Sequence, residues 1–256
     1  AIAPKMGEIL GQSVIVENKS GAAGTIAADQ IAKANPDGYT LLMGAETSHS
    51  TMATLEKGKL RYDLLKDFTP VMIVGSVPLV VVVNPNVPVR TLKGLVDYAK
   101  ANPDKLNYAS SGAGAPQRMG AEIFQKEAGI KITHVPYKGS GPAALDLMAG
   151  HIDMMLDTGS LNNIKGGKLK ALAVASDKRI PELPNVPTLK ESGVPMVANA
   201  WYGVMLPANA PKDITEKLNA AFNKVLKDPE VRKSLQAIGA QVDGGSVAEF
   251  TKFSQS

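Results

Sequence analysis

The 256-residue chain contains no cysteine, which excludes disulfide bonds and thiolate chemistry. Aromatic residues make up only 5% of the sequence, and Trp201 is the single tryptophan. The longest apolar run, residues 77–83, is interrupted by Pro78 and is far too short to cross a bilayer. The sequence also lacks the basic start, apolar stretch and cleavage site of a signal peptide. We therefore expect either a cytoplasmic protein or one from which a signal has been removed.

Charge is not concentrated anywhere in the chain. The formal net charge is +4 and the isoelectric point is near 9.1, but Lys and Arg are spread along the whole sequence. No basic stripe with interleaved aromatic residues is present, which argues against nucleic-acid binding. A diffuse positive field modestly favours encounter with small anions.

The common catalytic and cofactor motifs are missing as well. A dinucleotide fingerprint would need a third glycine where Gln117 stands, and no lysine follows the glycines as a mononucleotide P-loop requires. Ala109 precedes Ser111 where a lipase-type elbow has glycine. The three histidines are far apart in the sequence, and we expect each to be structural or exposed. We therefore predict no cofactor, no metal and no catalytic residue.

What the sequence does contain is a regular alternation of strands and helices. Strands are expected at 14–16, 39–44, 78–83, 106–110, 132–136, 152–156 and 169–175, and helices at 2–10, 25–34, 91–101, 116–128, 141–149 and 161–165. This alternation predicts βαβ units and a mainly parallel sheet. The last fifty residues are mostly helical, with helix starts at Pro211, at Asp228-Pro229 and at the capping box Ser246–Glu249.

Four of the expected strands end in loops of small residues. These loops are Ala45-Glu46-Thr47-Ser48, Ser110 to Gly114, Lys138-Gly139-Ser140-Gly141 and Asp157-Thr158-Gly159-Ser160. Small residues at any one of these places are also ordinary turn chemistry. Four such loops, each before a helix N-terminus, favour a binding cleft lined by N–H and hydroxyl donors, and such donors suit carboxylates.

The ordered set of motifs resembles a known receptor family. The segments "VIVENKSGAAGTIAADQIAKANPDGYTLLMG", "LNYASSGAGAP", "HVPYKGSGPAALDLMAGHIDMMLD" and "WYGVMLPANAPKDI" are similar to the Bug (TctC-type) extracytoplasmic solute receptors. The resemblance covers essentially the whole chain. It implies an α/β, two-lobed type II periplasmic-binding-protein fold with the ligand cleft between the lobes. Lobe one would hold residues 1–80 and 203–256, and lobe two residues 81–202.

The resemblance also implies a function. Such a receptor is periplasmic and monomeric, and it captures a small organic carboxylate for a tripartite tricarboxylate transporter, whose membrane subunits are its partners. Two alternatives stay open, namely a small-molecule enzyme of α/β class and the effector-binding domain of a transcription regulator. The second usually carries a helix-turn-helix segment, and none is visible in the sequence.

Ligand-binding residues are carried over from the family position by position. Asp157 has two readings, as a contact to an amino or hydroxyl group of the ligand or as a cap of the following helix. Glu46 departs from the family pattern and could disfavour a second ligand carboxylate. The residues implied are Ala45, Thr47, Ser48, Ser110, Ser111, Gly112, Gly114, Ala115, Gly139, Ser140 and Asp157.

The start of the chain is a second departure from the family. Its members normally begin with a strand and a Pro/Gly-rich loop that touches the ligand, followed by the helix that opens this sequence. We expect one of two situations. Either the intact protein is longer at its start, or the molecule has an open, poorly occupied site and a disordered or swapped edge beside residues 14–16.

Overall fold

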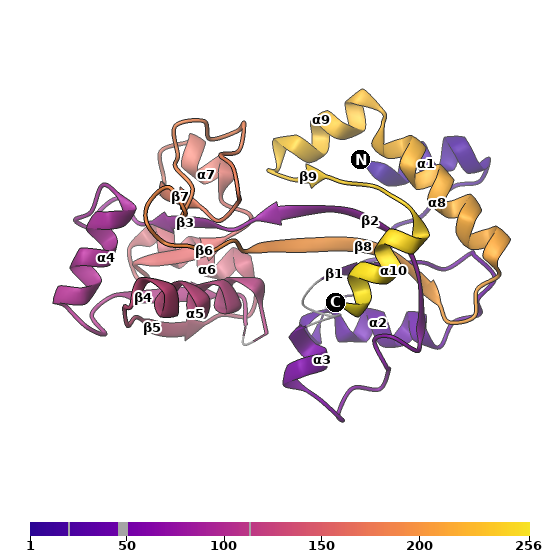
Figure 1. The fold of residues 1–256 in the computed structure, drawn as a ribbon, viewed down its shortest axis with the longest axis horizontal. Coiled ribbons are helices and arrows are strands. Elements are labelled where there is room, and N and C mark those ends of the chain that lie inside the picture. The colour runs from indigo at the N-terminus through magenta and orange to yellow at the C-terminus, as the bar shows by residue number, and fades with distance from the viewer. Residues whose placement is uncertain (20, 46–50, 113) are drawn as a thin grey trace. The chain divides into compact units, whose positions relative to one another are not determined.

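The computed structural model describes residues 1–256 except residues 20, 46–50 and 113 (Figure 1). The chain divides into two compact units, unit 1 formed by Ala1–Ser76 with Trp201–Ser256 and unit 2 formed by Val77–Ala200. Strands β2 (Phe68–Pro78) and β8 (Asn199–Pro207) contain the two points where the chain passes from one unit to the other. None of the described helices is both long and apolar enough to cross a membrane.

Unit 1 is built on a four-stranded sheet with the order β1-β8-β2-β9. β1 (Leu42–Ala45) pairs antiparallel with β8, and β9 (Gln241–Val242) pairs antiparallel with β2. Some apolar residues of β2 and β8 pack against α1 and α8 in one core cluster, and others pack against α2 and α10 in a second. The helical elements of this unit are α1 (Ile2–Leu10), η1 (Ala22–Gly24), α2 (Thr25–Ala32), α3 (Met52–Leu55), α8 (Lys212–Leu226), α9 (Pro229–Ala237) and α10 (Val247–Gln255).

The helix ends of unit 1 follow the predicted capping residues. The Asp228 side chain accepts from the N–H groups of Glu230 and Val231 at the start of α9. Ser246 and Glu249 form both hydrogen bonds of a capping box at the start of α10. Local sequence therefore fixes where these helices begin, because the first N–H groups of a helix have no intrahelical partner.

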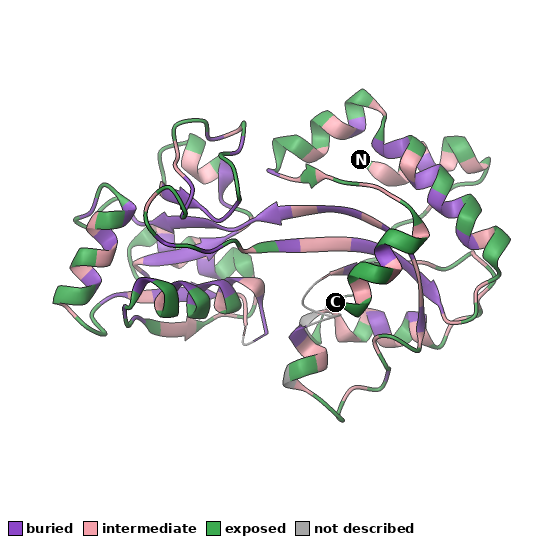
Figure 2. Ribbon diagram, in the orientation of Figure 1, coloured by how far each residue is buried: buried purple, intermediate pink, exposed green. Residues whose placement is uncertain are grey.

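Unit 2 is built on a five-stranded sheet with the order β5-β4-β6-β3-β7. Successive valines of β3 point into different cores, Val81 and Val83 into one cluster and Val80 and Val82 into the other. β3 is thus buried on both faces, as the run "PLVVVV" predicts, and in Figure 2 both β3 and its neighbour β6 are buried throughout. The strands are β3 (Val80–Val83), β4 (Asn107–Ser110), β5 (Thr133–Pro136), β6 (Met154–Asp157) and β7 (Lys170–Val174). The helices are α4 (Leu92–Ala101), α5 (Pro116–Ala128), α6 (Ser140–Ala149) and α7 (Leu161–Lys165).

Strand direction in unit 2 differs from the sequence prediction. β4 is parallel to both β5 and β6, but β3 is antiparallel to β6 and to β7. An apolar run indicates that a strand is buried on both faces, but it does not indicate whether the strand is parallel to its neighbours. The connections between strands decide that direction. The expectation of a mainly parallel sheet is therefore correct only for β5, β4 and β6.

Residues 14–16 form no strand, contrary to the prediction. Ile15 and Val16 are 82% and 68% exposed, so the β-branched run packs against little of the chain. β-propensity expresses packing on a pleated, half-buried surface, and three residues without such a surface do not form a strand. The prediction also missed β2 and β8, the longest strands that the structure describes.

Candidate functional site

Three of the predicted loops lie at one edge of the unit 2 sheet. β4 ends at Ser110, β5 at Pro136 and β6 at Asp157, and a helix follows each strand. Because β4 is parallel to both of its neighbours, the carboxyl ends of all three strands lie at the same edge. In open α/β sheets, ligands bind in the crevice outside these ends.

The side chain of Gln117, in the first turn of α5, joins the three loops. Its Oε1 accepts a hydrogen bond from the Ser111 hydroxyl at 2.9 Å. Its Nε2 donates to Ser140 Oγ and to Asp157 Oδ1, both at 3.2 Å. Gln117 is only 4% exposed. A buried amide that bonds to all three loops holds them together, because leaving any of these polar atoms unpaired would cost free energy.

Asp157 is a buried carboxylate, 3% exposed, at the end of β6. Its Oδ2 accepts from the Ser160 hydroxyl at 2.5 Å, while Oδ1 accepts from Gln117. Among the described residues, no N–H of α7 donates to this carboxylate, so Asp157 is not a backbone cap. Its hydrogen bonds tie the loop before α7 to the start of α5.

Ser110 and His134 form a second polar group beneath the same loop. Ser110 is fully buried, and its Oγ lies 2.7 Å from His134 Nε2. The Ser110 hydroxyl also donates to the Gly112 carbonyl at 3.0 Å and accepts from the Gly112 N–H at 3.3 Å. The imidazole ring stacks on Tyr108 with a centroid distance of 4.9 Å.

The environment of His134 keeps its ring neutral at neutral pH. Burial lowers the pKa of His134, and the positive charge of Arg118 lowers this pKa further, whereas the Glu122 carboxylate opposes both. Burial also raises the pKa of the Tyr108 phenol, as does the hydrogen bond that this phenol donates to Glu122. Ser110 and His134 are therefore both uncharged beside the loop.

The outer layer of the site consists of backbone and hydroxyl groups. Ser111, Gly112 and Gly139 are half-buried, and Ser140 and Gly141 are exposed. In the described part of the chain, the N–H groups of Ser111 and Gly139 donate to no other group. The N–H groups of Ser140 and Gly141 lie in the first turn of α6, where a helix offers them no acceptor.

The predicted site residues thus fall into two layers. Ser110, Gly114, Ala115 and Asp157 are buried and support the loops, and the Ala115 N–H donates to the Gly112 carbonyl. Ser111, Gly112, Gly139 and Ser140 reach the surface. Gly112 and Gly139 have φ of 145° and 118°, values that favour glycine and let the backbone face a ligand.

Sequence reasoning missed Gln117 and His134 as supports of the loops, and it named Ser160 only as part of a loop. Gln117 was considered only as a break in a nucleotide motif. A glutamine just after Pro116, at the start of a helix that leaves a small-residue loop, was the available signal. His134 carried no such signal, because its partner Ser110 is distant in sequence.

The remaining predicted residues belong to unit 1. Ala45 ends β1 and lies opposite Tyr202 in the β1–β8 register. Thr47 and Ser48, with Glu46, lie outside the described residues. No group of three or more His, Asp or Glu residues in the described ranges has an arrangement that could hold a metal ion.

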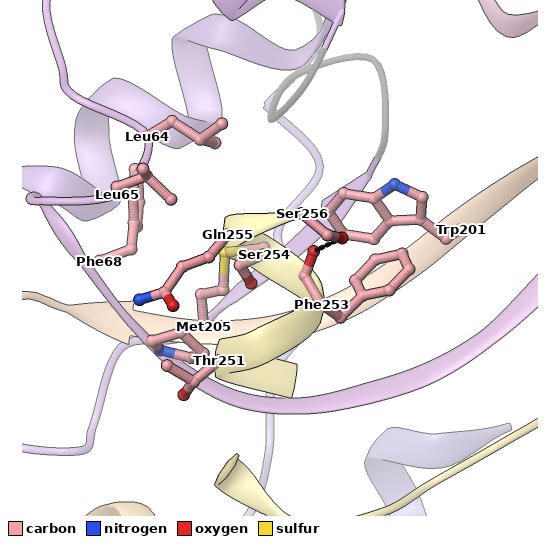
Figure 3. A pocket seen from close by; sticks show the side chains of 11 residues that line it. Leu64, Leu65, Phe68, Trp201, Met205, Thr251, Phe253, Ser254, Gln255 and Ser256 are labelled. Carbon is pink, nitrogen blue, oxygen red and sulfur yellow. Dashed lines mark hydrogen bonds between the residues drawn. The ribbon is translucent and has the colours of Figure 1, made fainter. Parts of the chain in front are cut away.

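Unit 1 also contains an apolar cavity of about 290 Å³ (Figure 3). It lies between α10 and the segment before β2, and none of its lining residues is a predicted ligand residue. Trp201 packs edge-on against Phe253 and Phe250 of α10, with ring centroids 5.4 and 6.0 Å apart. The lining residues are Leu64, Leu65, Phe68, Pro70, Trp201, Met205, Thr251, Phe253, Ser254, Gln255 and Ser256.

Comparison with known structures gives the same fold. The structure of periplasmic binding protein BugD is 34% identical with a TM-score of 0.89, over 99% of this chain and 86% of that one. The structure of Rhodopseudomonas palustris Rpa4515 with adipate is 34% identical with a TM-score of 0.91, over 99% of this chain and 86% of that one. The structure of MatC from the same organism with bound malate is 33% identical with a TM-score of 0.88, over 99% and 88%.

The fold is that of the two-lobed periplasmic class of solute-binding proteins. All residues, 1–256, match the family described as "Tripartite tricarboxylate transporter family receptor", TctC. The chain belongs to this family, which confirms the resemblance seen in the sequence. It is a receptor of the tripartite tricarboxylate transporter type.

Proposed function

We propose that this receptor captures a small organic carboxylate, in the first place a dicarboxylate, at the three loops of unit 2. The observation that carries the proposal is the buried Gln117 side chain, which bonds to all three loops. It orders a set of neutral donors, the N–H groups of Ser111, Gly139 and Ser140 with the Ser140 hydroxyl, which accepts from Gln117 and keeps its own proton. Such donors hold a carboxylate well because charge-assisted hydrogen bonds are short and strong.

The relatives' ligands support this class of solute. Rpa4515 was solved with adipate and MatC with malate, and both ligands are dicarboxylates. The buried Asp157 carboxylate lies behind the loops without a cationic partner among its hydrogen-bonding groups. A ligand that brings a hydroxyl or ammonium group toward this side of the site therefore has an electrostatic advantage over a plain dicarboxylate.

We further propose the wider setting that the family implies. Units 1 and 2 correspond to the two lobes, and Ala45, Thr47 and Ser48 supply the lobe-one contacts. The receptor works as a monomer in the periplasm and delivers its ligand to the membrane subunits of a tripartite transporter. These assignments rest on membership of the family.

An enzymatic role is the second candidate, because Ser110 Oγ lies within hydrogen-bond distance of His134 Nε2. We favour the receptor, because Ser110 is fully buried and its hydroxyl donates to Gly112 O. A nucleophile needs access to its substrate. Incubation of the purified protein with malate and adipate, followed by proton NMR, tests this choice: unchanged ligand supports the receptor, and turnover supports the enzyme.

A thermal-shift screen followed by calorimetric titration tests the proposed ligand class. The panel contains malate, adipate, acetate, amino acids, inorganic phosphate and sugars. A ligand at 100 times its dissociation constant stabilises the folded state by about 2.7 kcal/mol. We expect stabilisation by dicarboxylates. Stabilisation by sugars or phosphate alone would contradict the proposal.

A further inference from the structure

We propose that His134 is a positioning residue for the ligand loop and acts by donating its Nε2–H to Ser110. The inference rests on the proposed function, because the loop it orders is the proposed carboxylate site. It assigns a role, a tautomer and a direction of hydrogen bonding to a histidine that touches no proposed ligand group.

The direction of the hydrogen bond follows from counting protons around Ser110 Oγ. The Gly112 carbonyl oxygen lies 3.0 Å from this oxygen and accepts its hydrogen bond. The carbonyl has no proton of its own, so the Ser110 hydroxyl proton points to Gly112. The hydroxyl then has no second proton for His134, whose Nε2 lies 2.7 Å away. Nε2 must therefore carry its own hydrogen.

The result is a fully satisfied group beneath the loop. Ser110 Oγ donates once, to Gly112 O, and accepts twice, from His134 Nε2 and from the Gly112 N–H. The N–H and the carbonyl oxygen of Gly112 are therefore both hydrogen-bonded to Ser110. The carbonyl oxygen also accepts from the Ala115 N–H. The peptide between Ser111 and Gly112 keeps one orientation because its N–H is held by Ser110 Oγ. This fixes the backbone next to the Ser111 N–H, which has no acceptor among the described residues.

The ring of His134 is itself held in place. It stacks on Tyr108, which is fully buried in β4, with an interplanar angle of 29°. The charged groups that act on the ring are Arg118 and Glu122, both from α5. A ring fixed by a buried aromatic and by strand β5 loses little freedom when it donates to Ser110, so the hydrogen bond is preorganised.

The chain offers a matched set of variants for the test. His134→Phe keeps the stack on Tyr108 and removes the donor, whereas His134→Gln places a donor near the position of Nε2. Ser110→Ala removes the acceptor. His151→Phe is the control, because His151 lies 73% exposed beside Asp146, away from the three loops.

Affinity is measured by calorimetry, with malate and adipate as the probes. His134→Phe should weaken binding about tenfold, which corresponds to the loss of one hydrogen bond. Ser110→Ala should weaken binding at least as much, because it also removes the two hydrogen bonds to Gly112. The double variant should bind no more weakly than Ser110→Ala, because Ser110→Ala already lacks the acceptor for His134. His134→Gln should stay within about threefold of the wild type, and His151→Phe should be unchanged. Additive effects, or wild-type affinity in His134→Phe, would overturn the inference.

Two measurements without ligand separate this inference from the proposed function. The ¹⁵N shifts of His134 should show a neutral ring protonated at Nε2 at pH 7.5, and the Gly112 amide should exchange faster in His134→Phe. A ring protonated at Nδ1, or unchanged Gly112 exchange, would refute the positioning role. If the wild type binds no carboxylate, the proposed function fails while these two readouts still decide the role of His134.

Discussion

Replacing Gln117 with leucine should loosen the proposed site and destabilise the protein. The side chain makes three hydrogen bonds inside unit 2, one at 2.9 Å and two at 3.2 Å. Leucine has a similar volume and no polar atoms, so the substitution leaves Ser111 and Ser140 without these partners. It also removes one of the two donors to the buried Asp157 carboxylate.

The magnitude follows from these contacts. Each of the two hydrogen bonds to serine hydroxyls contributes about 0.5–1 kcal/mol net, and the buried charged acceptor Asp157 that loses a donor costs about 1–3 kcal/mol. Since Asp157 keeps its bond to Ser160, we take the lower part of that range. The free energy of unfolding should fall by about 2–4 kcal/mol, and the melting temperature by roughly 5–12 °C.

The assay combines chemical denaturation with calorimetric titration of malate and adipate. Gln125→Leu is the control, because Gln125 lies on the same helix and its side chain accepts from the Ile132 N–H, away from the loops. Both variants should lose stability, but only Gln117→Leu should lose affinity, about tenfold or more. Wild-type stability and affinity in Gln117→Leu would refute the assignment of Gln117 as the link between the loops.

Two further predictions concern pH and helix capping. Burial depresses the pKa of His134 in the folded state, so the stability it contributes is present above the ordinary value of about 6.5 and is lost as the pH falls below it. Melting curves between pH 7.5 and 5 should show this loss of stability in the wild type and a smaller loss in His134→Gln. An equal loss in the wild type and in His134→Gln would show that His134 is not its cause. Ser246→Ala removes the side-chain acceptor of the capping box and should cost about 1 kcal/mol in urea denaturation. A change below about 0.3 kcal/mol would show that Glu249 alone holds the start of α10.

Sequence patterns predicted those parts of the fold that local interactions decide. Thr91 accepts from the Gly94 N–H at the start of α4, and Pro116 stands in the first turn of α5, as expected. The strand 78–83 was recognised from its continuous apolar run. These signals depend on residues a few positions apart, so they can be read without knowing the fold.

The parts that failed depend on distant residues. The antiparallel direction of β3 follows from which strands it joins, and residues 14–16 lacked a surface on which to pair. In the site, the small residues of the loops marked them in the sequence, but the supporting side chains of Gln117 and His134 were not recognised. Gln117 lies 40 residues from Asp157 and Ser110 lies 24 from His134, so only the folded sheet edge reveals these partners.

An NMR titration of the ¹⁵N-labelled chain with malate and adipate tests the central claim most directly. The claim is that a carboxylate binds to the backbone donors of the three loops at the sheet edge of unit 2. We predict saturable, one-to-one shifts that are largest at the amides of Ser111, Gly112, Gly139 and Ser140. Saturable shifts centred instead on the cavity beside Phe68 and Phe253, or no saturable shift with any carboxylate, would contradict it.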